Sequence, residues 1–285
     1  MLQGKRGESV MKTILTIGGT DVCSGSGIQA DMKTILVNGC YGTSAVTAIT
    51  VFDRERSGRV MSIPADLVRE QLEACINNAK PNAVKIGMLS DVDTVRTVAE
   101  VIRENDLINI VLNPILISPE GKDLVPREVF RAVKDELLPL ADFLTPDISE
   151  LEYFSSKTIS TKENVIDASK ALSEKYGCTV ATKCGRIAGD AADLFFRDGY
   201  YKWFPGMIIR DANLHDAGNT IACAVAVNLA KGYEPDKAFK CAKDFVTQTL
   251  LNMVTFGSGL SFLDHNALVN GTFMGVLTDD ELSRM

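Results

Sequence analysis

The sequence predicts an α/β protein in which a doubly wound, mostly parallel sheet carries helices on both faces. Two observations predict this fold class. Apolar, β-branched runs of strand length recur along the chain, and segments with helical spacing of apolar residues separate them. Parallel strands need a crossover connection, which is usually a helix. The chain has 285 residues, of which 46% are hydrophobic and 24% charged, enough for a sizeable globular core.

Six segments carry the strand pattern. Each is apolar or β-branched and lacks the helical period, so each is predicted as a buried strand. In chain order the segments are 13–18, 44–51, 83–89, 108–116, 143–145 and 179–183. Ligands are expected at the carboxyl ends of such strands.

Three segments between the strands have helical spacing. One follows Pro64, a residue suited to a helix start, and places apolar residues over 67–79. Another repeats this spacing over 92–102. A further helix is predicted after Ser160, because Ser160 and Glu163 have the spacing of a capping box.

Charge and cysteine content exclude several classes of protein. The formal net charge is −7 and the basic residues form no stripe, so we expect no nucleic-acid partner. The apolar stretch 221–230 is half the ~20 residues that a membrane-spanning helix needs, so we expect no membrane association. The seven cysteines are scattered without paired C-x-x-C spacing. Reduced thiols, a cytoplasmic location and small-molecule partners fit this composition.

A loop of small and polar residues precedes the apolar stretch 221–230. It reads His215, Asp216, Ala217, Gly218, Asn219 and Thr220. A helix that begins here offers unpaired amides at the positive end of its dipole, a favourable place for a phosphate. Taken alone, the segment also fits an ordinary helix start capped by Asp216 or Asn219.

A glycine-rich segment, 18–31, follows the first predicted strand. Within it, Gly25 to Ala30 fits the G-x-G-x-x-G/A fingerprint, and Asp53 closes the second strand where a ribose-binding acid could lie. This pattern indicates an NAD-dependent dehydrogenase as an alternative. Against it, about six residues separate Gly18 from Gly25, whereas the fingerprint should begin directly at the strand end.

Four segments together resemble a known family. They are 19–33, with the motif G-I-Q-A-D-x-K-T, then 85–89, 144–146 and 215–220. In these segments the chain resembles the hydroxymethylpyrimidine/phosphomethylpyrimidine kinases and the similar bacterial pyridoxal kinases. Both belong to the ribokinase-like superfamily. The resemblance covers about residues 12–265 in one collinear order.

The resemblance implies a function and its cofactors. The expected reaction is ATP- and Mg²⁺-dependent phosphorylation of the hydroxymethyl group of a pyrimidine or pyridine, in vitamin B1 or B6 metabolism. The expected partner is thus a heteroaromatic alcohol, and the family implies a homo-oligomer, expected as a dimer. Residues 1–11 are expected to be a disordered or non-native extension, 12–268 a single kinase-like domain and 269–285 a tail.

The substrate site is implied by the same resemblance. Gly19, Asp21, Asp31 and Met88 inherit the substrate-binding assignment. Phe52 departs from the pyrimidine kinases, which carry a glutamine there to hydrogen-bond the ring. A phenylalanine offers only an apolar surface. A pyridine-type substrate is therefore a second possibility, and core packing is the plain alternative for Phe52.

The metal and phosphate contacts follow from two further motifs. Asp147 and Glu150 match the family's N-x-x-E element, with Asp147 in place of the asparagine, and carboxylate oxygens suit Mg²⁺. Asn113 replaces the aspartate of V-D-P. Taken alone, the two acids would be ordinary helix-start residues.

The remaining nucleotide contacts lie at Lys183 and in the late loop. The resemblance assigns Lys183, Gly185, Ala217 and Thr220 to the bound nucleotide. A lone lysine at a strand end is otherwise a solvated charge.

The late loop departs from the family at its catalytic positions. The family's general base is a cysteine or aspartate where this chain has Asn219, and a glycine is replaced by Asp216. One hypothesis is a working kinase whose base is Asp216 or, second, His215, with Gly218 admitting the phosphate. The other is a catalytically impaired paralogue that binds a ligand or regulates. A titratable group restored at position 219 is expected to raise the rate.

Overall fold

A computed structural model describes most of the chain. The described residues are 11–53, 56–117, 121–185, 187, 191–209, 217–257, 259, 261–267 and 269, with side chains at 52, 53, 56 and 57 excepted. The expected N-terminal extension and C-terminal tail therefore lie almost entirely outside the described residues. So do His215, Asp216 and the side chain of Phe52.

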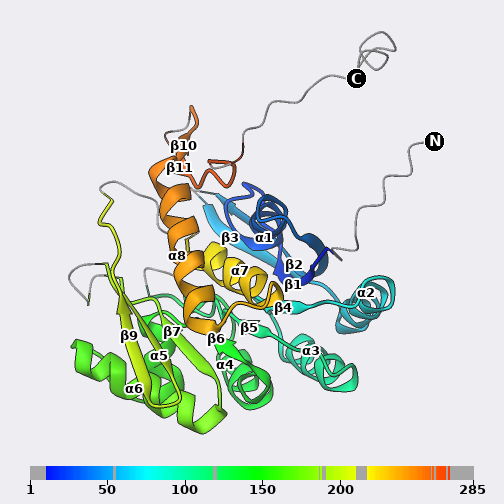
Figure 1. The fold of residues 1–285 in the computed structure, drawn as a ribbon. Coiled ribbons are helices and arrows are strands. Elements are labelled where there is room, and N and C mark those ends of the chain that lie inside the picture. The colour runs from blue at the N-terminus through cyan, green and yellow to red at the C-terminus, as the bar shows by residue number, and fades with distance from the viewer. Residues whose placement is uncertain are drawn as a thin grey trace.

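The described residues form one nine-stranded sheet of order β3-β2-β1-β4-β5-β6-β7-β8-β9 (Figure 1). Its six central strands run parallel to one another, which confirms the predicted fold class. These strands are β1 (Thr13–Gly19), β2 (Tyr41–Asp53), β4 (Ala83–Ile86), β5 (Ile110–Leu112), β6 (Phe143–Leu144) and β7 (Thr179–Thr182).

Three antiparallel strands at the edges of the sheet were not predicted. They are β3 (Arg56–Ser62), β8 (Asp193–Arg197) and β9 (Tyr200–Phe204). The turn between β8 and β9 is Asp198-Gly199, and both residues have positive φ, 49° and 79°. Asp-Gly is a strong signal for a hairpin turn, so the sequence did carry the information. A small second sheet pairs β10 (Val254–Thr255) with β11 (Ser261–Phe262).

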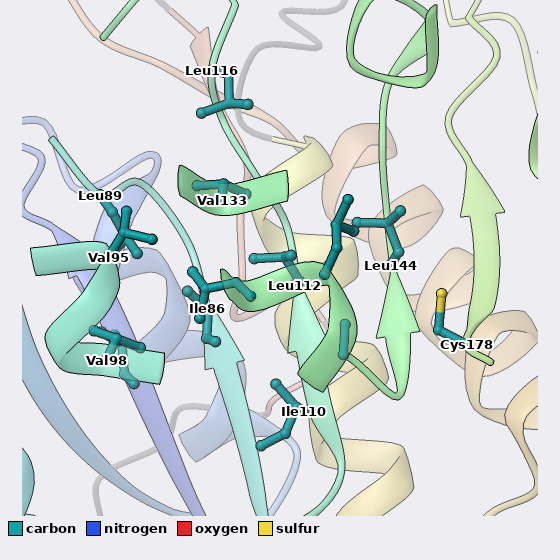
Figure 2. Packing of buried hydrophobic residues seen from close by; sticks show 14 of the residues in the cluster. Ile86, Leu89, Val95, Val98, Ile110, Leu112, Leu116, Val133, Leu144 and Cys178 are labelled. Atoms are coloured by element: carbon teal, nitrogen blue, oxygen red, sulfur yellow. The ribbon is translucent and has the colours of Figure 1, made fainter. Parts of the chain in front are cut away.

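Helices cover both faces of the large sheet, as predicted. One face carries α1 (Gly27–Val37), α7 (Ala217–Ala230) and α8 (Pro235–Leu251), of which α7 and α8 lie in front of the sheet in Figure 1. The opposite face packs into a separate apolar core (Figure 2). Its elements are α2 (Ala65–Asn78), α3 (Val92–Glu104), α4 (Arg127–Ala132), the π-turn Val133–Leu137, the 3-10 turn Leu138–Leu140, α5 (Ile148–Ser155) and α6 (Lys162–Tyr176).

Two cores follow directly from the alternation of side chains along a strand. In β1, Ile14 points into the core beneath α1 and α7, whereas Leu15 and Ile17 point into the opposite core. Helix α7 is buried along nearly its whole length because it lies between the sheet, α1 and α8. The apolar stretch 221–230 is therefore a core helix, as expected.

One predicted helix start is displaced by a residue. Helix α6 is capped by Thr161, whose side chain accepts from the backbone N–H of Asn164 at 3.3 Å. Ser160 instead donates its hydroxyl to the Asn164 side-chain oxygen at 3.2 Å. The expectation that Ser160 caps this helix is therefore wrong. Helix α2 begins after Pro64, as predicted.

The strand order reverses at β1. Helix α1 leaves β1 toward one face, and α3 leaves the neighbouring β4 toward the other. Such a point opens a crevice at the carboxyl ends of the two strands, where ligands bind in this class of fold. Gly18 and Gly87 meet there, and a Cβ on Gly18 would lie 3.8 Å from the Gly87 Cα.

Candidate active site

The glycine segment after β1 is braced by its own side chains. The Asp21 carboxylate accepts from the backbone N–H groups of Cys23 at 3.1 Å, Gly25 at 2.8 Å and Ser26 at 2.9 Å. The Asp21 N–H in turn donates to the Gln29 side chain at 2.9 Å. Asp21 therefore organises the loop, and this segment is held in one shape before any ligand binds.

Gly27 closes this segment and begins α1. Its φ is +61°, and a Cβ at this position would lie 2.6 Å from the Gly19 carbonyl oxygen. No other residue fits without moving the backbone. Residues 20–26 separate the end of β1 from α1, so the loop is too long for a dinucleotide fingerprint, in which the glycine turn follows the strand at once. The geometry argues against the dehydrogenase alternative.

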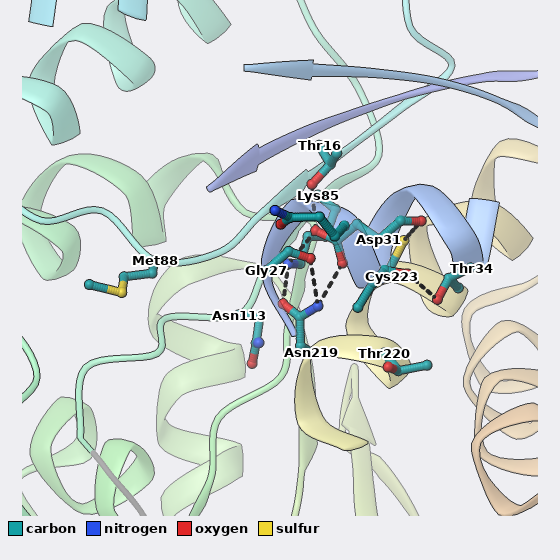
Figure 3. Close-up of polar contacts among 12 residues, drawn as sticks. Thr16, Gly27, Asp31, Thr34, Lys85, Met88, Asn113, Asn219, Thr220 and Cys223 are labelled. Atoms are coloured by element: carbon teal, nitrogen blue, oxygen red, sulfur yellow. Dashed lines mark hydrogen bonds and ion pairs between the residues drawn. The ribbon is translucent and has the colours of Figure 1, made fainter. Parts of the chain in front are cut away.

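A fully buried polar group joins α1, β4 and α7 (Figure 3). Lys85 of β4 donates from Nζ to Asp31 Oδ2 at 2.7 Å and to Asn219 Oδ1 at 2.5 Å. The exposed fractions of Lys85, Asp31 and Asn219 are 1%, 0% and 3%. Thr16 also donates to Asp31 Oδ2. We call Asp31, Lys85 and Asn219 the buried trio.

The two predicted site residues in the trio are bound to protein groups. Asn219 donates from Nδ2 to Asp31 Oδ1 at 2.9 Å and to the Gly27 carbonyl at 3.2 Å. Both amide hydrogens and one side of Oδ1 are thus occupied. Asp31 has no exposed surface and accepts from Thr16, Lys85 and Asn219. The structure thus places both residues in the buried interior.

Two other predicted substrate residues, Gly19 and Met88, lie at the carboxyl ends of β1 and β4. Gly19 packs against β2, where an added Cβ would lie 3.4 Å from Thr50 Cγ2. Met88 follows β4, is 8% exposed and accepts from Thr47 at its backbone oxygen, 2.8 Å away. Its side chain points away from the buried trio in Figure 3.

A positive charge lies at the start of α7. A Cβ on Gly218 would lie 3.1 Å from Lys183 Nζ, so the ammonium group touches the first turn of the helix. Lys183 donates to Asn113 Oδ1 at 2.9 Å, and Thr145 donates to the same oxygen at 3.3 Å. Three predicted residues, Asn113, Lys183 and Gly218, are therefore brought together. A lysine and a helix N-terminus both favour a bound anion.

The segment that carries Lys183 is held by a pair that the sequence reading missed. Asp193 accepts from the Cys184 N–H at 3.0 Å and from Lys243 at 2.5 Å. Lys243 of α8 and Asp193 of β8 are largely buried. Gly185, which follows, has φ +54°. No spacing signal connects Asp193 with Lys243, because they lie fifty residues apart.

Thr220 faces inward rather than toward the crevice. It has no exposed surface, and its hydroxyl pairs with Nε2 of His265 at 3.1 Å. Burial, and secondly the charge of Lys33, lower the pKa of His265 to about 4, so this buried histidine is neutral at physiological pH. His265 was not predicted. Ala217, its neighbour in the predicted nucleotide set, is the first residue of α7 and is half-buried.

Asp147 and Glu150 form a capping box at the start of α5. Asp147 accepts from the Glu150 N–H at 2.8 Å, and Glu150 accepts from the Asp147 N–H at 3.0 Å. Glu150 also accepts from the Leu116 N–H at 3.0 Å. Burial, and then the charge of Asp147, raise the pKa of Glu150 to about 7. Both acids therefore act as helix-start residues in this structure, and a cation beside Glu150 would relieve its unfavourable burial.

Among the described residues, no three or more His, Cys, Asp or Glu side chains come together in a cluster that could hold a metal ion by itself. No helix in this part of the chain is both long enough and apolar enough to cross a bilayer.

The described residues combine a mostly parallel α/β sheet with a lysine against the first turn of a buried helix and a braced glycine segment after β1, an arrangement that suits a phosphotransferase. The sequence profile described as phosphomethylpyrimidine kinase matches residues 21–264, and the chain belongs to that family. This confirms the resemblance seen in the four sequence motifs.

Characterised relatives include kinases for two vitamins. The chain is 32% identical to the hydroxymethylpyrimidine/phosphomethylpyrimidine kinase of Haemophilus influenzae, over 90% of this chain and 97% of that protein. It is 31% identical to the pyridoxine kinase of Bacillus subtilis, again over 90% and 97%.

Solved structures agree. The ADP complex of Bacillus subtilis pyridoxal kinase has a TM-score of 0.84 at 30% identity, covering 90% of this chain and 98% of that one. The Staphylococcus aureus pyridoxal kinase with AMP-PCP and pyridoxal has a TM-score of 0.83 at 28% identity, covering 91% and 95%. The chain is thus an ATP-dependent kinase of this vitamin-precursor family. The comparisons support neither the dehydrogenase nor the non-catalytic alternative.

Proposed function

We propose that this enzyme transfers the γ-phosphoryl group of ATP to the hydroxymethyl group of a pyridine of the pyridoxal type. The observation that carries the proposal is the Lys183 ammonium group against Gly218 at the start of α7. The Phe52-Asp53 sequence, which lacks the glutamine of pyrimidine kinases, favours a pyridine. The likeness to pyridoxal kinases bound to AMP-PCP and pyridoxal supports the same choice.

The nucleotide end of the proposed site fits an anion. The described acceptors of Lys183 include the neutral amide of Asn113, so a phosphate would add a charged partner without displacing a carboxylate. Bound ATP would supply the transferable group, and Lys183, Gly218 and the first amides of α7 would stabilise the charge that moves during transfer. Gly185 and Ala217 flank this region. Thr220 would act indirectly, through the first turn of the helix.

Glu150 and Asp147 are proposed to orient Mg²⁺ and its waters, with Asn113 nearby. The raised pKa of Glu150 supports this, because a divalent cation would favour the ionised carboxylate. Two protein carboxylates are enough for an ion whose other ligands are phosphate oxygens and waters. Magnesium would neutralise charge on the phosphates that these residues face.

Proton removal from the substrate is proposed to fall to Asp216, with His215 as the second candidate. Both precede Gly218 in the chain. Asn219 has no titratable group, and its amide is held by the buried trio. Positioning and charge stabilisation provide most of the catalysis in phosphoryl transfer, so a displaced base remains compatible with turnover.

Cytoplasmic location and homodimer formation complete the proposal. None of the seven cysteines, all of which are described, is in a disulfide, which fits a reducing compartment. Dimer formation rests on the family resemblance, and equilibrium sedimentation measures it directly.

A steady-state assay tests the proposed reaction. ADP release is followed with Mg·ATP and pyridoxal, hydroxymethylpyrimidine or its monophosphate, against an acceptor-free background, and the phosphorylated product is identified by mass. We expect kcat/KM to be highest with pyridoxal. A preference for either pyrimidine would overturn the substrate assignment, and no product from any acceptor would overturn the kinase assignment.

A further inference from the structure

We propose that the buried trio of Asp31, Lys85 and Asn219 is a positioning device that sets the distance between the two substrates. It rests on the proposed function, because it joins the parts of the chain assigned to each substrate. In this role Asn219 replaces the general base of the family by a residue that holds α7 in place. Lys85 and Asn219 are positioning residues and touch neither substrate.

The three side chains of the trio come from three different elements (Figure 3). Asp31 belongs to α1, which begins at Gly27, where the braced glycine segment ends. Lys85 belongs to β4, which leads through Gly87 to Met88 on the proposed substrate side. Asn219 lies in the first turn of α7, beside Gly218 and Lys183. Three elements that carry the site are thus tied together at one buried point.

The hydrogen bonds of the trio require an amide at position 219. Its oxygen accepts from the Lys85 ammonium group, while its nitrogen donates to Asp31 and to the Gly27 carbonyl. An aspartate could accept from Lys85 but would oppose the Asp31 carboxylate and the Gly27 oxygen. The trio is also electrically balanced, with one cation and one anion, and a second buried carboxylate would leave an uncompensated charge.

Lys85 itself has little freedom to move. A Cβ on Gly87 would lie 2.9 Å from the Lys85 Nζ, so the backbone passes directly over the ammonium group. Any side chain at position 87 would push Nζ off one of its two acceptors. The position of Lys85 is therefore fixed by a glycine as well as by its hydrogen bonds. Under this proposal a titratable group at position 219 is expected to lower the rate, which is the opposite of the expectation drawn from the sequence.

Asn219→Ala separates positioning from simple stability. The variant keeps the Lys85–Asp31 ion pair, whose net charge is zero. It removes only the hydrogen bonds by which the Asn219 side chain links α7 to the trio and to Gly27. We expect kcat to fall about 100-fold, because small displacements of reacting groups have effects of this size. The Kd values of AMP-PCP and of pyridoxal, each measured alone by calorimetry, should stay unchanged, since each half of the site remains intact.

Val98→Ala is the matched control for stability. Val98 lies in α3 in the opposite core, where truncation leaves a cavity and lowers Tm without touching the trio (Figure 2). We expect its kcat to stay at the wild-type value. If Asn219→Ala lowers Tm but keeps the wild-type kcat, the trio is only structural and the proposal is overturned.

A charge swap gives a second, independent test. Asn219→Asp alone should lower kcat, and combining it with Asp31→Asn should restore at least about tenfold of the loss, because the pair again holds one carboxylate and one amide around Lys85. A rise in kcat for Asn219→Asp alone, with a new acid limb in the pH–rate profile, would make position 219 the base site and overturn the proposal. A double variant whose kcat is no higher than that of Asn219→Asp alone would also overturn the proposal.

Failure of the proposed function would look different. If the wild-type enzyme forms no phosphorylated product, the kinase assignment fails before any variant is compared. If the wild type is active and Asn219→Ala matches it, only the positioning role fails.

Discussion

Two groups of charged side chains, both at the carboxyl edge of the sheet, differ in how their charges are matched. In the buried trio, Lys85 faces the Asp31 carboxylate, the exposed fractions are near zero, and Asn219 fills the remaining hydrogen bonds. At the ends of β5 to β7, Lys183 instead donates to the neutral Asn113 and is half-buried. Nearby, Glu150 is buried with a raised pKa.

This difference in charge matching distinguishes a group that holds the fold together from a group that is suited to binding a ligand. A balanced, buried group gains nothing from a further charge, whereas a cation and an unfavourably buried carboxylate both gain from a bound metal–phosphate complex. Lys85 and Lys183 both lie near the ends of predicted strands. The sequence alone does not indicate which of them is structural and which binds a ligand. The partners, rather than the residue type, assign their roles.

Lys85→Met should have the largest effect on stability. Removing one partner of a buried ion pair leaves the Asp31 charge uncompensated, which typically costs about 3–5 kcal/mol. Urea denaturation should show this loss in the free energy of unfolding. The matched variant Lys183→Met should lose less than about 1 kcal/mol, because Lys183 has a neutral acceptor. Equal losses would contradict the contrast between the two groups.

Lys183→Met should have the largest effect on catalysis. We expect kcat to fall roughly 10²–10³-fold, the typical result of removing one preorganised group from a site of charge development. Steady-state kinetics at saturating ATP and pyridoxal measures it. Lys183→Arg keeps the charge and should recover part of the rate. A wild-type kcat in Lys183→Met would show that the cation is not at the reacting phosphate.

Raising the pH should lower the free energy of unfolding through Glu150. The pKa of Glu150 is raised to about 7 in the folded protein, so the folded state holds a proton that the unfolded state releases near pH 4.5. Its contribution therefore lowers stability progressively from about pH 4.5 to pH 7. Mg²⁺ should reverse this loss above pH 7 by favouring the carboxylate.

Thermal melts with and without Mg·AMP-PCP at pH 6 and pH 8 measure that reversal. Glu150→Gln should remove most of the pH dependence of the magnesium effect. If the variant and wild type gain equally from Mg·AMP-PCP at both pH values, Glu150 is a helix cap alone.

Lowering the pH should instead reduce the free energy of unfolding through His265, near the trio, by a smaller amount than the Glu150 effect. The pKa of His265 is lowered to about 4 in the folded protein, against 6.5 when unfolded. Stability is complete above pH 6.5 and is lost as the pH falls toward 4, by about 2 kcal/mol between pH 7 and pH 5. His265→Gln should flatten this part of the stability profile in urea titrations. An unchanged profile would place the acid sensitivity elsewhere.

Much of the fold was readable from the sequence because its central strands are buried on both faces. Six apolar runs predicted β1, β2, β4, β5, β6 and β7, and their order in the chain indicated crossovers. The strands that were missed are at the edges, where exposed residues such as Tyr200 and Tyr201 break the apolar pattern. Their only clear local signal was the Asp198-Gly199 turn.

The sequence predicted which residues belong to the candidate site, but not how all of their side chains are oriented. Motifs brought Asn113, Lys183 and Gly218 together correctly, since these come from the ends of neighbouring elements. The inward orientation of Asp31 and Thr220 was not predictable, because it depends on partners distant in sequence. Lys85 is 54 residues from Asp31, and His265 is 45 residues from Thr220.

The close approach of Gly27 to the Gly19 carbonyl limits how this enzyme could be redesigned. A library that varies position 27 would consist mostly of misfolded loops, because every added Cβ collides with the backbone. Val22 lies on the same loop with 57% of its surface exposed, and variation there leaves the chain path intact. Altered acceptor preference is therefore best sought at the outer positions of this loop, with both glycines kept constant.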